Sequence, residues 1–307
     1  MGGSGFLGMK LARYLSEKGY EATIVSRSEP VIGPWSFALW DGRTLGDWAS
    51  VIDGAQAVVN LAGRTVDCIK SPLNCDQILR SRVESTRVLG DAIKAAKVKP
   101  SVWVQMSTAH IYGDSELICD EQAAIGYGLA PTVGIQWERA HNEKCPQDVR
   151  SVILRTSFVL GNTGAALQKL KLITRLGLGG TIASGTQGMS WIHELDMNRI
   201  IERAIADGSM AGVYISSSPS PVSNRIFMRS LRKACNMPIG LPAAAWMIKI
   251  GARLILRADP DLAIYGRYCV PQRLIDEGFE FEHPEIDEAL DDLCRDVVEA
   301  QASTTDA

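Results

Sequence analysis

The chain has 307 residues, 46% of them apolar and 22% charged, which is typical of a globular protein with one large α/β domain and room for a smaller partner domain. Its 32 basic and 35 acidic residues give a net charge of -3, so we expect a small-molecule partner, with no nucleic acid and no membrane surface. The seven cysteines and four histidines show no metal-ligand spacing, so no disulfide framework and no metal site is expected. The sequence opens without a signal peptide and lacks a membrane-spanning apolar run, which favours a cytoplasmic protein.

Apolar periodicity predicts alternating helices and strands in the first half of the chain. Leu7, Leu11 and Leu15 recur every four residues, which indicates a helix that ends at Gly19. Short apolar runs predict strands at 22–26, 58–61, 102–106 and 152–154. This alternation is typical of an α/β Rossmann fold, a doubly wound parallel sheet with helices on both faces.

The alternation becomes irregular after about residue 160. Ser223 has the character of an N-cap for a helix over 224–234, and apolar residues at 286, 290, 293 and 297 predict a final amphipathic helix. We therefore predict a Rossmann domain at 1–160, with a further strand near 190–196. A smaller α+β substrate-side region would occupy 162–307.

A glycine-rich turn directly precedes the first predicted helix. Gly2, Gly5 and Gly8 are three residues apart, with Ser4, Phe6 and Leu7 between them. Glycines in this pattern allow a tight turn, a close backbone approach to a pyrophosphate and close helix–strand packing. The free N–H groups at the helix N-terminus favour the same anion. The pattern predicts a dinucleotide site; the alternative is a flexible glycine-rich terminus.

The strand that should precede such a turn is missing from the sequence. In this fold that strand lies at the centre of the sheet, and its loss would leave both neighbouring strands without partners. We expect either that the start of the sequence is truncated, which we favour, or that another segment fills the gap.

Two further strand ends carry residues suited to the cofactor. Ser26 and Arg27 follow the 22–26 strand, where an enzyme that uses NAD would carry an acidic residue for the ribose. An arginine there suits the 2′-phosphate, so NADP is favoured over NAD. The alternative is that Arg27 is a solvated loop residue. Asn60, Leu61, Ala62 and Gly63 end the next strand, and their small side chains would let the adenosine approach the backbone.

A series of motifs runs along nearly the whole chain in a specific order and spacing. These motifs are Asn60–Gly63, Ser107–Gly113, Trp137–Glu138, Leu154–Thr156, Arg175–Gly180, Met189–His193 with Asp196, Val270–Leu274 and Gly278–Phe281. Together they resemble the extended short-chain dehydrogenase/reductase superfamily, in its NAD-dependent epimerase/dehydratase group. They also resemble one atypical branch of it, a set of sugar-nucleotide epimerase-like proteins with a C-terminal domain of their own (DUF1731 type), here at about 245–300.

The resemblance implies a set of site residues. A hydroxyl residue, a Tyr and a Lys carry catalysis in the superfamily, and the hydroxyl matches Thr108, with Ser107 as its neighbour. The Tyr-x-x-x-Lys pair is absent: Ala130 and Gly134 stand in its place, and Tyr127 is followed four residues later by Pro131. Weaker catalytic candidates are Tyr112 and His193. On the cofactor side the resemblance adds Arg155 and Thr156.

Two functions remain open. The first is an NADP(H)-dependent oxidoreductase or epimerase that acts on a small polar carbonyl or hydroxyl compound, of a sugar-like kind, through a non-standard active site. The alternative is a catalytically silent NADP(H)-binding sensor or scaffold. The chain would be a monomer or a homodimer, and the resemblance implies dimerisation through helices near 72–96 and 133–145.

Overall fold

The computed structural model describes residues 1–251 and 259–302, and it confirms an α/β fold with parallel strands. The main sheet has the strand order β10-β6-β4-β3, and all its pairs are parallel. Its strands are β3 (Ala57–Asn60), β4 (Val102–Thr108), β6 (Arg150–Thr156) and β10 (Gly212–Ser216). A second parallel pair joins β1 (Ala22–Ser26) to β2 (Trp35–Leu39).

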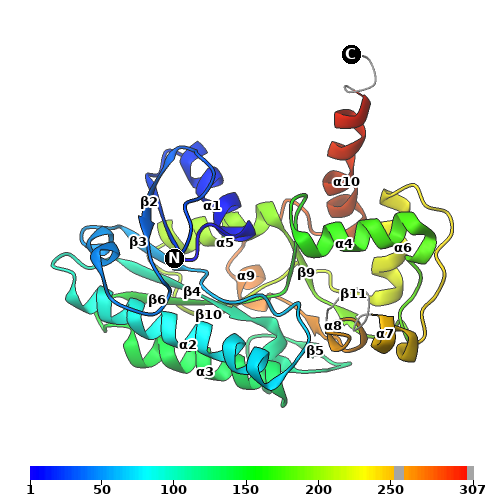
Figure 1. Ribbon diagram of the computed structural model, residues 1–307, viewed down its shortest axis with the longest axis horizontal. Coiled ribbons are helices and arrows are strands. Elements are labelled where there is room, and N and C mark those ends of the chain that lie inside the picture. The colour runs from blue at the N-terminus through cyan, green and yellow to red at the C-terminus, as the bar shows by residue number, and fades with distance from the viewer. Residues whose placement is uncertain (252–258, 303–307) are drawn as a thin grey trace.

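Helices cover both faces of the main sheet, as predicted. Figure 1 shows α2 (Pro72–Ala95) and α3 (Leu129–Lys144) below the sheet, with α1 (Phe6–Glu17) and α5 (Glu194–Ala206) above it. On the upper side, Leu11 and Ile201 pack against Val104 in one apolar core. On the lower side, Leu89 and Trp103 belong to a second core. Because the strands of the main sheet are parallel, their carboxyl ends lie at one edge, where ligands bind in folds of this kind.

Most predicted elements are confirmed, but the prediction missed several strands, among them the five-residue strands β2 and β10, and misassigned part of the strand near 190–196. β2 went unrecognised because its apolar side chains are largely half-buried or exposed, and β10 because it lies in the irregular half of the chain. The strand predicted near 190–196 ends at His193: β9 (Trp191–His193) pairs with β7 (Phe158–Leu160). Residues 194–196 are helical because His193 caps α5, its Nδ1 accepting a hydrogen bond from the Leu195 N–H.

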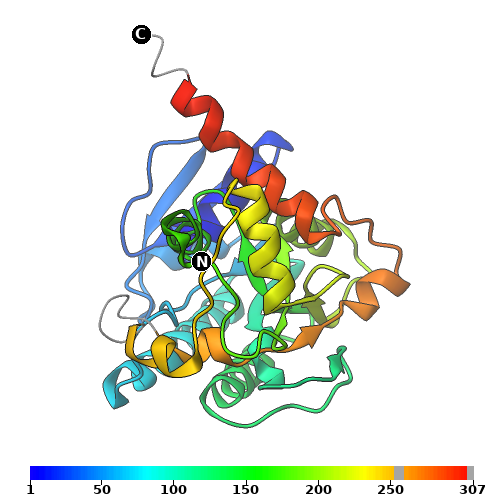
Figure 2. The ribbon, with the colours of Figure 1, turned by 90° about the vertical axis from the view of Figure 1, so that its right-hand side faces the viewer.

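The second half of the chain forms a smaller body beside the sheet. Ser223 caps α6 (Asn224–Ala234) as predicted, and the final helix α10 runs over Ile286–Ala302. Figure 2 shows α6 beside α10, and Phe227 packs with Leu290 between them. The remaining elements are η1 (Asp47–Ile52), η2 (Ala109–Tyr112), β5 (Ile118–Cys119), α4 (Ala165–Ile173), η3 (Thr174–Leu178), β8 (Gly188–Met189), β11 (Val222–Ser223), α7 (Ala245–Gly251), α8 (Asp261–Ile264), β12 (Tyr268–Cys269) and α9 (Gln272–Asp276).

Part of the family-specific region expected at about 245–300, residues 252–258, lies outside the described residues. Among the helices of the described ranges, none is both long and apolar enough to cross a bilayer.

The N-terminal residues join the two sheets. The Met1 amino nitrogen donates to the Val59 carbonyl at 2.8 Å, and the Leu61 N–H donates to the Met1 carbonyl at 3.0 Å. On the other side, the Gly2 N–H donates to the Val25 carbonyl at 2.8 Å. Residues 1–3 therefore bridge β3 and β1 as the end of a parallel strand would.

Candidate cofactor site

The three glycines of the turn meet different surroundings. Gly2 has φ +70°, and a Cβ there would lie 2.8 Å from the Ala62 Cα, so backbone conformation and close packing both require glycine. A Cβ on Gly8 would lie 2.4 Å from the Gly3 Cα. Gly2 therefore lets the turn lie against the segment after β3, and Gly8 lets the start of α1 lie against Gly3.

Gly5 differs because the protein leaves space around it. It is the exposed N-cap of α1, with φ -79° and ψ 173°, a conformation open to any residue. A Cβ there would meet only the Gly2 carbonyl oxygen, at 3.7 Å. Among the residues that the structure describes, no side chain caps α1, and the first turn of α1 has no acidic residue. The free N–H groups therefore offer a site for an anion.

Asn60 fixes the strand end opposite the turn. It is fully buried; its side-chain nitrogen donates to Thr86 Oγ1 at 3.1 Å and to Gln105 Oε1 at 2.9 Å. Its Oδ1 accepts from the Ala62 N–H at 3.1 Å. Asn60 thus positions the backbone of residues 61–63, while its own polar atoms are occupied by protein partners.

Ser26 and Arg27 end β1 at the same edge of the sheet. Ser26 is buried, and its hydroxyl donates to the Ser28 carbonyl at 2.7 Å, which shapes the loop. Arg27 is exposed directly after it. Phe6, at the start of α1, lies against Gly161, where a Cβ would come within 2.3 Å of its ring.

The residues of this candidate site lie within a segment that matches a known protein family. The sequence pattern described as the NAD dependent epimerase/dehydratase family matches residues 1–214, and that of a domain of unknown function, DUF1731, matches residues 243–293. The chain belongs to the NAD-dependent epimerase/dehydratase family. The match confirms the resemblance read from the motifs.

Relatives and solved structures agree with this family. The human epimerase family protein SDR39U1 is 32% identical over 303 residues, 95% of this chain and 97% of that protein. A crystal structure of human SDR39U1 (isoform 2) with NADPH superposes with a TM-score of 0.84 at 28% identity, covering 96% of this chain and 97% of that one. A nucleoside-diphosphate sugar epimerase from Corynebacterium glutamicum gives a TM-score of 0.75 at 25% identity, covering 94% and 56% of the two chains.

Gly134, which stands about where the superfamily's lysine is expected, packs closely on η2. A Cβ on Gly134 would lie only 3.1 Å from the Ile111 Cγ1, because α3 packs closely on η2. Tyr127, the tyrosine nearest to the expected position, is 97% exposed and precedes α3. A larger residue at position 134 would therefore need the Ile111 side chain to shift by a few tenths of an ångström.

A buried polar network connects three of the residues named from the sequence. Arg155 makes two hydrogen bonds of 2.9 Å to the Glu138 carboxylate and donates to the Tyr112 hydroxyl at 3.0 Å. The Ser107 hydroxyl donates to the same carboxylate at 2.6 Å. Burial opposes the charge on Arg155, but Glu138 outweighs it and raises the Arg155 pKa. Burial likewise raises the Tyr112 pKa. The polar groups of Arg155, Tyr112 and Ser107 are thus engaged with one another and with Glu138.

The remaining hydroxyls lie at the carboxyl ends of β4 and β6. Thr108 is half-buried, and its Oγ1 accepts from the His110 N–H at 3.1 Å, which caps η2. That bond leaves the hydroxyl proton of Thr108 available to another acceptor. The buried Thr156 hydroxyl donates to the Leu154 carbonyl at 3.2 Å. Unlike the Ser107 hydroxyl, which donates to Glu138, the Thr108 hydroxyl keeps its proton for another acceptor.

Arg82 is a cation that sequence reasoning missed. Its guanidinium lies against Gly63, where a Cβ would be 3.2 Å from Cζ, and it covers the Trp137 ring at 5.0 Å. Its Nη1 donates to the Ile78 carbonyl at 3.0 Å, and burial lowers its pKa to about 10. Only the fold brings α2 beside residues 60–63, so no sequence spacing signals this contact.

His193 serves α5. Besides the cap on the Leu195 N–H, its Nε2 lies 3.2 Å from Asp292 Oδ2, and its ring stacks on His283 at 3.9 Å. These three side chains offer donor atoms within 4.8 Å of one another, a spacing that could hold a metal ion. Because Nδ1 accepts the cap hydrogen bond, the neutral ring carries its proton on Nε2. Metal ligation through Nε2 would therefore require α5 to lose its cap.

Buried histidines make stability depend on pH. Burial lowers the pKa of His141 and of His193 from 6.5 to about 4. Below pH 6.5 the unfolded chain binds protons that the folded chain does not. The free energy of unfolding should therefore fall between pH 6.5 and 4, and each tenfold difference in proton affinity between the two states contributes about 1.4 kcal/mol. Urea titrations at stepped pH measure this fall. His141→Gln should make it shallower, and an identical pH profile would contradict the assignment.

Proposed function

We propose that this chain is an NADP(H)-dependent oxidoreductase or epimerase that acts on a small polar carbonyl or hydroxyl compound of a sugar-like kind. The observation that carries the proposal is the space at Gly5, beside uncapped helix N–H groups, in a chain whose relative SDR39U1 was crystallised with NADPH. Residues 162–307 would supply the substrate side.

The residues present fit this cofactor. The Gly2–Gly8 turn would hold the pyrophosphate, because a Cβ on Gly5 would enter the space that the turn leaves open. Arg27, exposed at the end of β1, would pair with the 2′-phosphate. The small residues Ala62 and Gly63 would border the adenosine, with Arg82 behind them. The bound cofactor would supply or accept a hydride.

Thr108 would act on the substrate. Its hydroxyl proton would hydrogen-bond the substrate oxygen and polarise a carbonyl there. Ser107 and Glu138 would hold the end of β4 in place through their 2.6 Å hydrogen bond. Without a tyrosine and lysine beside Thr108, proton transfer would depend on this hydroxyl and on solvent.

The second candidate is a catalytically silent NADP(H)-binding sensor or scaffold. It is favoured by the packing of Gly134 against Ile111 and by the engagement of Tyr112 with Arg155. Cofactor binding needs neither the missing tyrosine nor the missing lysine, whereas efficient proton transfer usually needs such groups.

Two measurements separate these candidates. Calorimetric titration of NADPH and of NADH should show tight NADPH binding and weak NADH binding. A screen of bound NADPH against small carbonyl compounds should then show oxidation, and Thr108→Val should abolish it with NADPH affinity unchanged. NADPH binding without turnover of any compound would favour the sensor, and no binding of either cofactor would overturn both candidates.

Arg27→Ala should weaken NADPH binding by about 10- to 100-fold and NADH binding by much less, since a charge-assisted contact to the 2′-phosphate contributes about 1.5–3 kcal/mol. Competitive titration of the two cofactors measures the ratio. Arg13→Ala removes another exposed arginine, from α1, and should leave both affinities unchanged. An equal loss for NADPH and NADH on Arg27→Ala would remove the case for NADP.

A further inference from the structure

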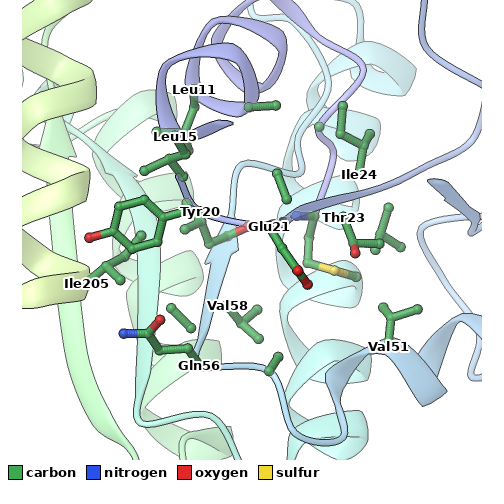
Figure 3. Close-up of a pocket in the computed structure, with 18 of the residues that line it drawn as sticks. Leu11, Leu15, Tyr20, Glu21, Thr23, Ile24, Val51, Gln56, Val58 and Ile205 are labelled. Carbon is green, nitrogen blue, oxygen red and sulfur yellow. Dashed lines mark hydrogen bonds between the residues drawn. The ribbon is translucent and has the colours of Figure 1, made fainter. Parts of the chain in front are cut away.

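Two pairs of cysteine thiols lie outside the candidate cofactor site, and neither pair lines the cavity of about 600 Å³ that separates β1 from β3 (Figure 3). Cys119 and Cys269 are paired in register between β5 and β12. Cys235 follows the last residue of α6 and lies within hydrogen-bonding reach of the Cys294 thiol in α10. All four are free thiols. A thiol in contact with a second thiol can form a disulfide with it when an oxidant reaches either one.

The two pairs differ in their access to solvent. Cys119 and Cys269 are buried, at 4% and 0% exposed. Cys294 is buried too, but Cys235 is only half-buried at the end of its helix. Thiol–disulfide exchange requires the oxidant to reach the attacking sulfur atom. Of the two pairs, Cys235 and Cys294 therefore form the one that a dissolved oxidant can reach.

A buried lysine lies beside this pair. Lys171 belongs to α4, which packs against α6 and α10 in one apolar core (Figure 1), and it is 1% exposed. Its Nζ donates to the Leu293 carbonyl at 3.0 Å and hydrogen-bonds the Cys294 thiol. Among the side chains that the structure describes, no carboxylate forms an ion pair with Lys171. Lysine is almost never buried this deeply without a charged partner, and a thiolate of this pair would supply the negative charge.

The surroundings of Cys235 favour its thiolate. The neighbouring Cys294 thiol, together with the positive charges of Arg175 and Lys171, outweighs burial and lowers the Cys235 pKa from 9.0 to about 7. Cys145 is also half-buried, but there burial dominates and raises the pKa to about 11. Because the thiolate is the nucleophilic form of cysteine, Cys235 is suited to react first at neutral pH.

We propose that Cys235 and Cys294 form a reversible redox site that is oxidised by small dissolved disulfides, of which glutathione disulfide is the probe. The Cys235 thiolate would attack one sulfur of the oxidant, whose S–S bond breaks and releases a thiolate that takes a proton from water. Cys294 would then lose its proton to water and attack the Cys235 sulfur. The new bond joins the two protein sulfurs, and the second half of the oxidant leaves as a thiolate that is protonated in turn. The protein pair loses two electrons, and the oxidant is reduced to two thiols.

The test exposes the full reduced chain to glutathione disulfide at neutral pH. Free thiols are blocked with iodoacetamide at stepped times, and cross-linked peptides are identified by mass spectrometry. The Cys235–Cys294 link should form about 10-fold faster than a Cys119–Cys269 link, and a small dithiol should reverse it. In Cys294→Ser the reaction should stop at a glutathione adduct on Cys235.

Two lysine variants test the buried charge. Lys171→Met keeps a long side chain but removes the charge, and it should slow the Cys235–Cys294 link by about 10-fold. Lys169→Met removes an exposed lysine from the same helix and should leave the rate unchanged. Equal rates in the two variants would overturn the proposal.

The remaining outcomes also decide the matter. A Cys235–Cys294 link that does not form, or forms no faster than the Cys119–Cys269 link, would overturn the proposal, as would a lasting glutathione adduct on Cys235 in the parent chain. Should Lys171→Met not be recovered folded, the rate of iodoacetamide alkylation against pH in the parent chain is the second measurement. The Cys235 rate should rise with a midpoint near pH 7, well below that of Cys145, and equal midpoints would overturn the proposal. None of these results depends on NADPH binding.

Discussion

Gly5→Val is expected to reduce NADPH affinity at least 100-fold, a loss of about 2.7 kcal/mol, while the domain stays folded. The backbone of Gly5 is extended and accepts valine without strain, and the nearest protein atom to the new Cβ is the Gly2 carbonyl oxygen at 3.7 Å. The valine methyl groups would enter only the space proposed for the pyrophosphate. Calorimetric titration gives the affinity, and a thermal scan checks the fold.

Gly208→Val is the matched control for Gly5→Val. Gly208 is exposed in a turn after α5, and a Cβ there meets nothing within 4 Å. This variant should bind NADPH like the parent chain. If Gly5→Val also bound NADPH with unchanged affinity, the turn would not be the pyrophosphate site, and the proposed function would lose its main support.

Arg155→Met is expected to lower the free energy of unfolding by about 3–5 kcal/mol, because it leaves the Glu138 carboxylate buried without its counter-ion. Both side chains are about nine-tenths buried, at 9% and 11% exposed, and two hydrogen bonds of 2.9 Å join them. The Tyr112 hydroxyl loses its donor in the same variant. Urea unfolding measures the difference.

The double variant Glu138→Leu with Arg155→Met separates the cost of an unpaired charge from the value of the pair. Replacing a whole buried ion pair by apolar residues is often close to neutral, so the double variant should recover most of the stability lost in Arg155→Met. A loss below about 1 kcal/mol in Arg155→Met would show that solvent reaches Glu138, and the network would not be what fixes the end of β4.

The sequence by itself determined the features that depend on neighbouring residues. Apolar patterns predicted α1, β1 and α10 because periodicity follows from local backbone geometry. The spacing of Gly2, Gly5 and Gly8 predicted a turn ahead of a helix for the same reason. Order and spacing of the later motifs were sufficient for the family, which the comparisons confirm.

Only the tertiary structure decided what distant residues do to one another. Arg155 and Tyr112 are 43 positions apart in the chain, and their hydrogen bond exists because β6 lies beside the end of β4. Arg82 reaches Gly63, and His193 reaches Asp292, through packing that no local pattern records. The backbone contacts of residues 1–3 with β1 and β3 likewise appear only once both strands are placed in space. Local patterns specify elements, whereas burial and pairing are properties of the assembled fold.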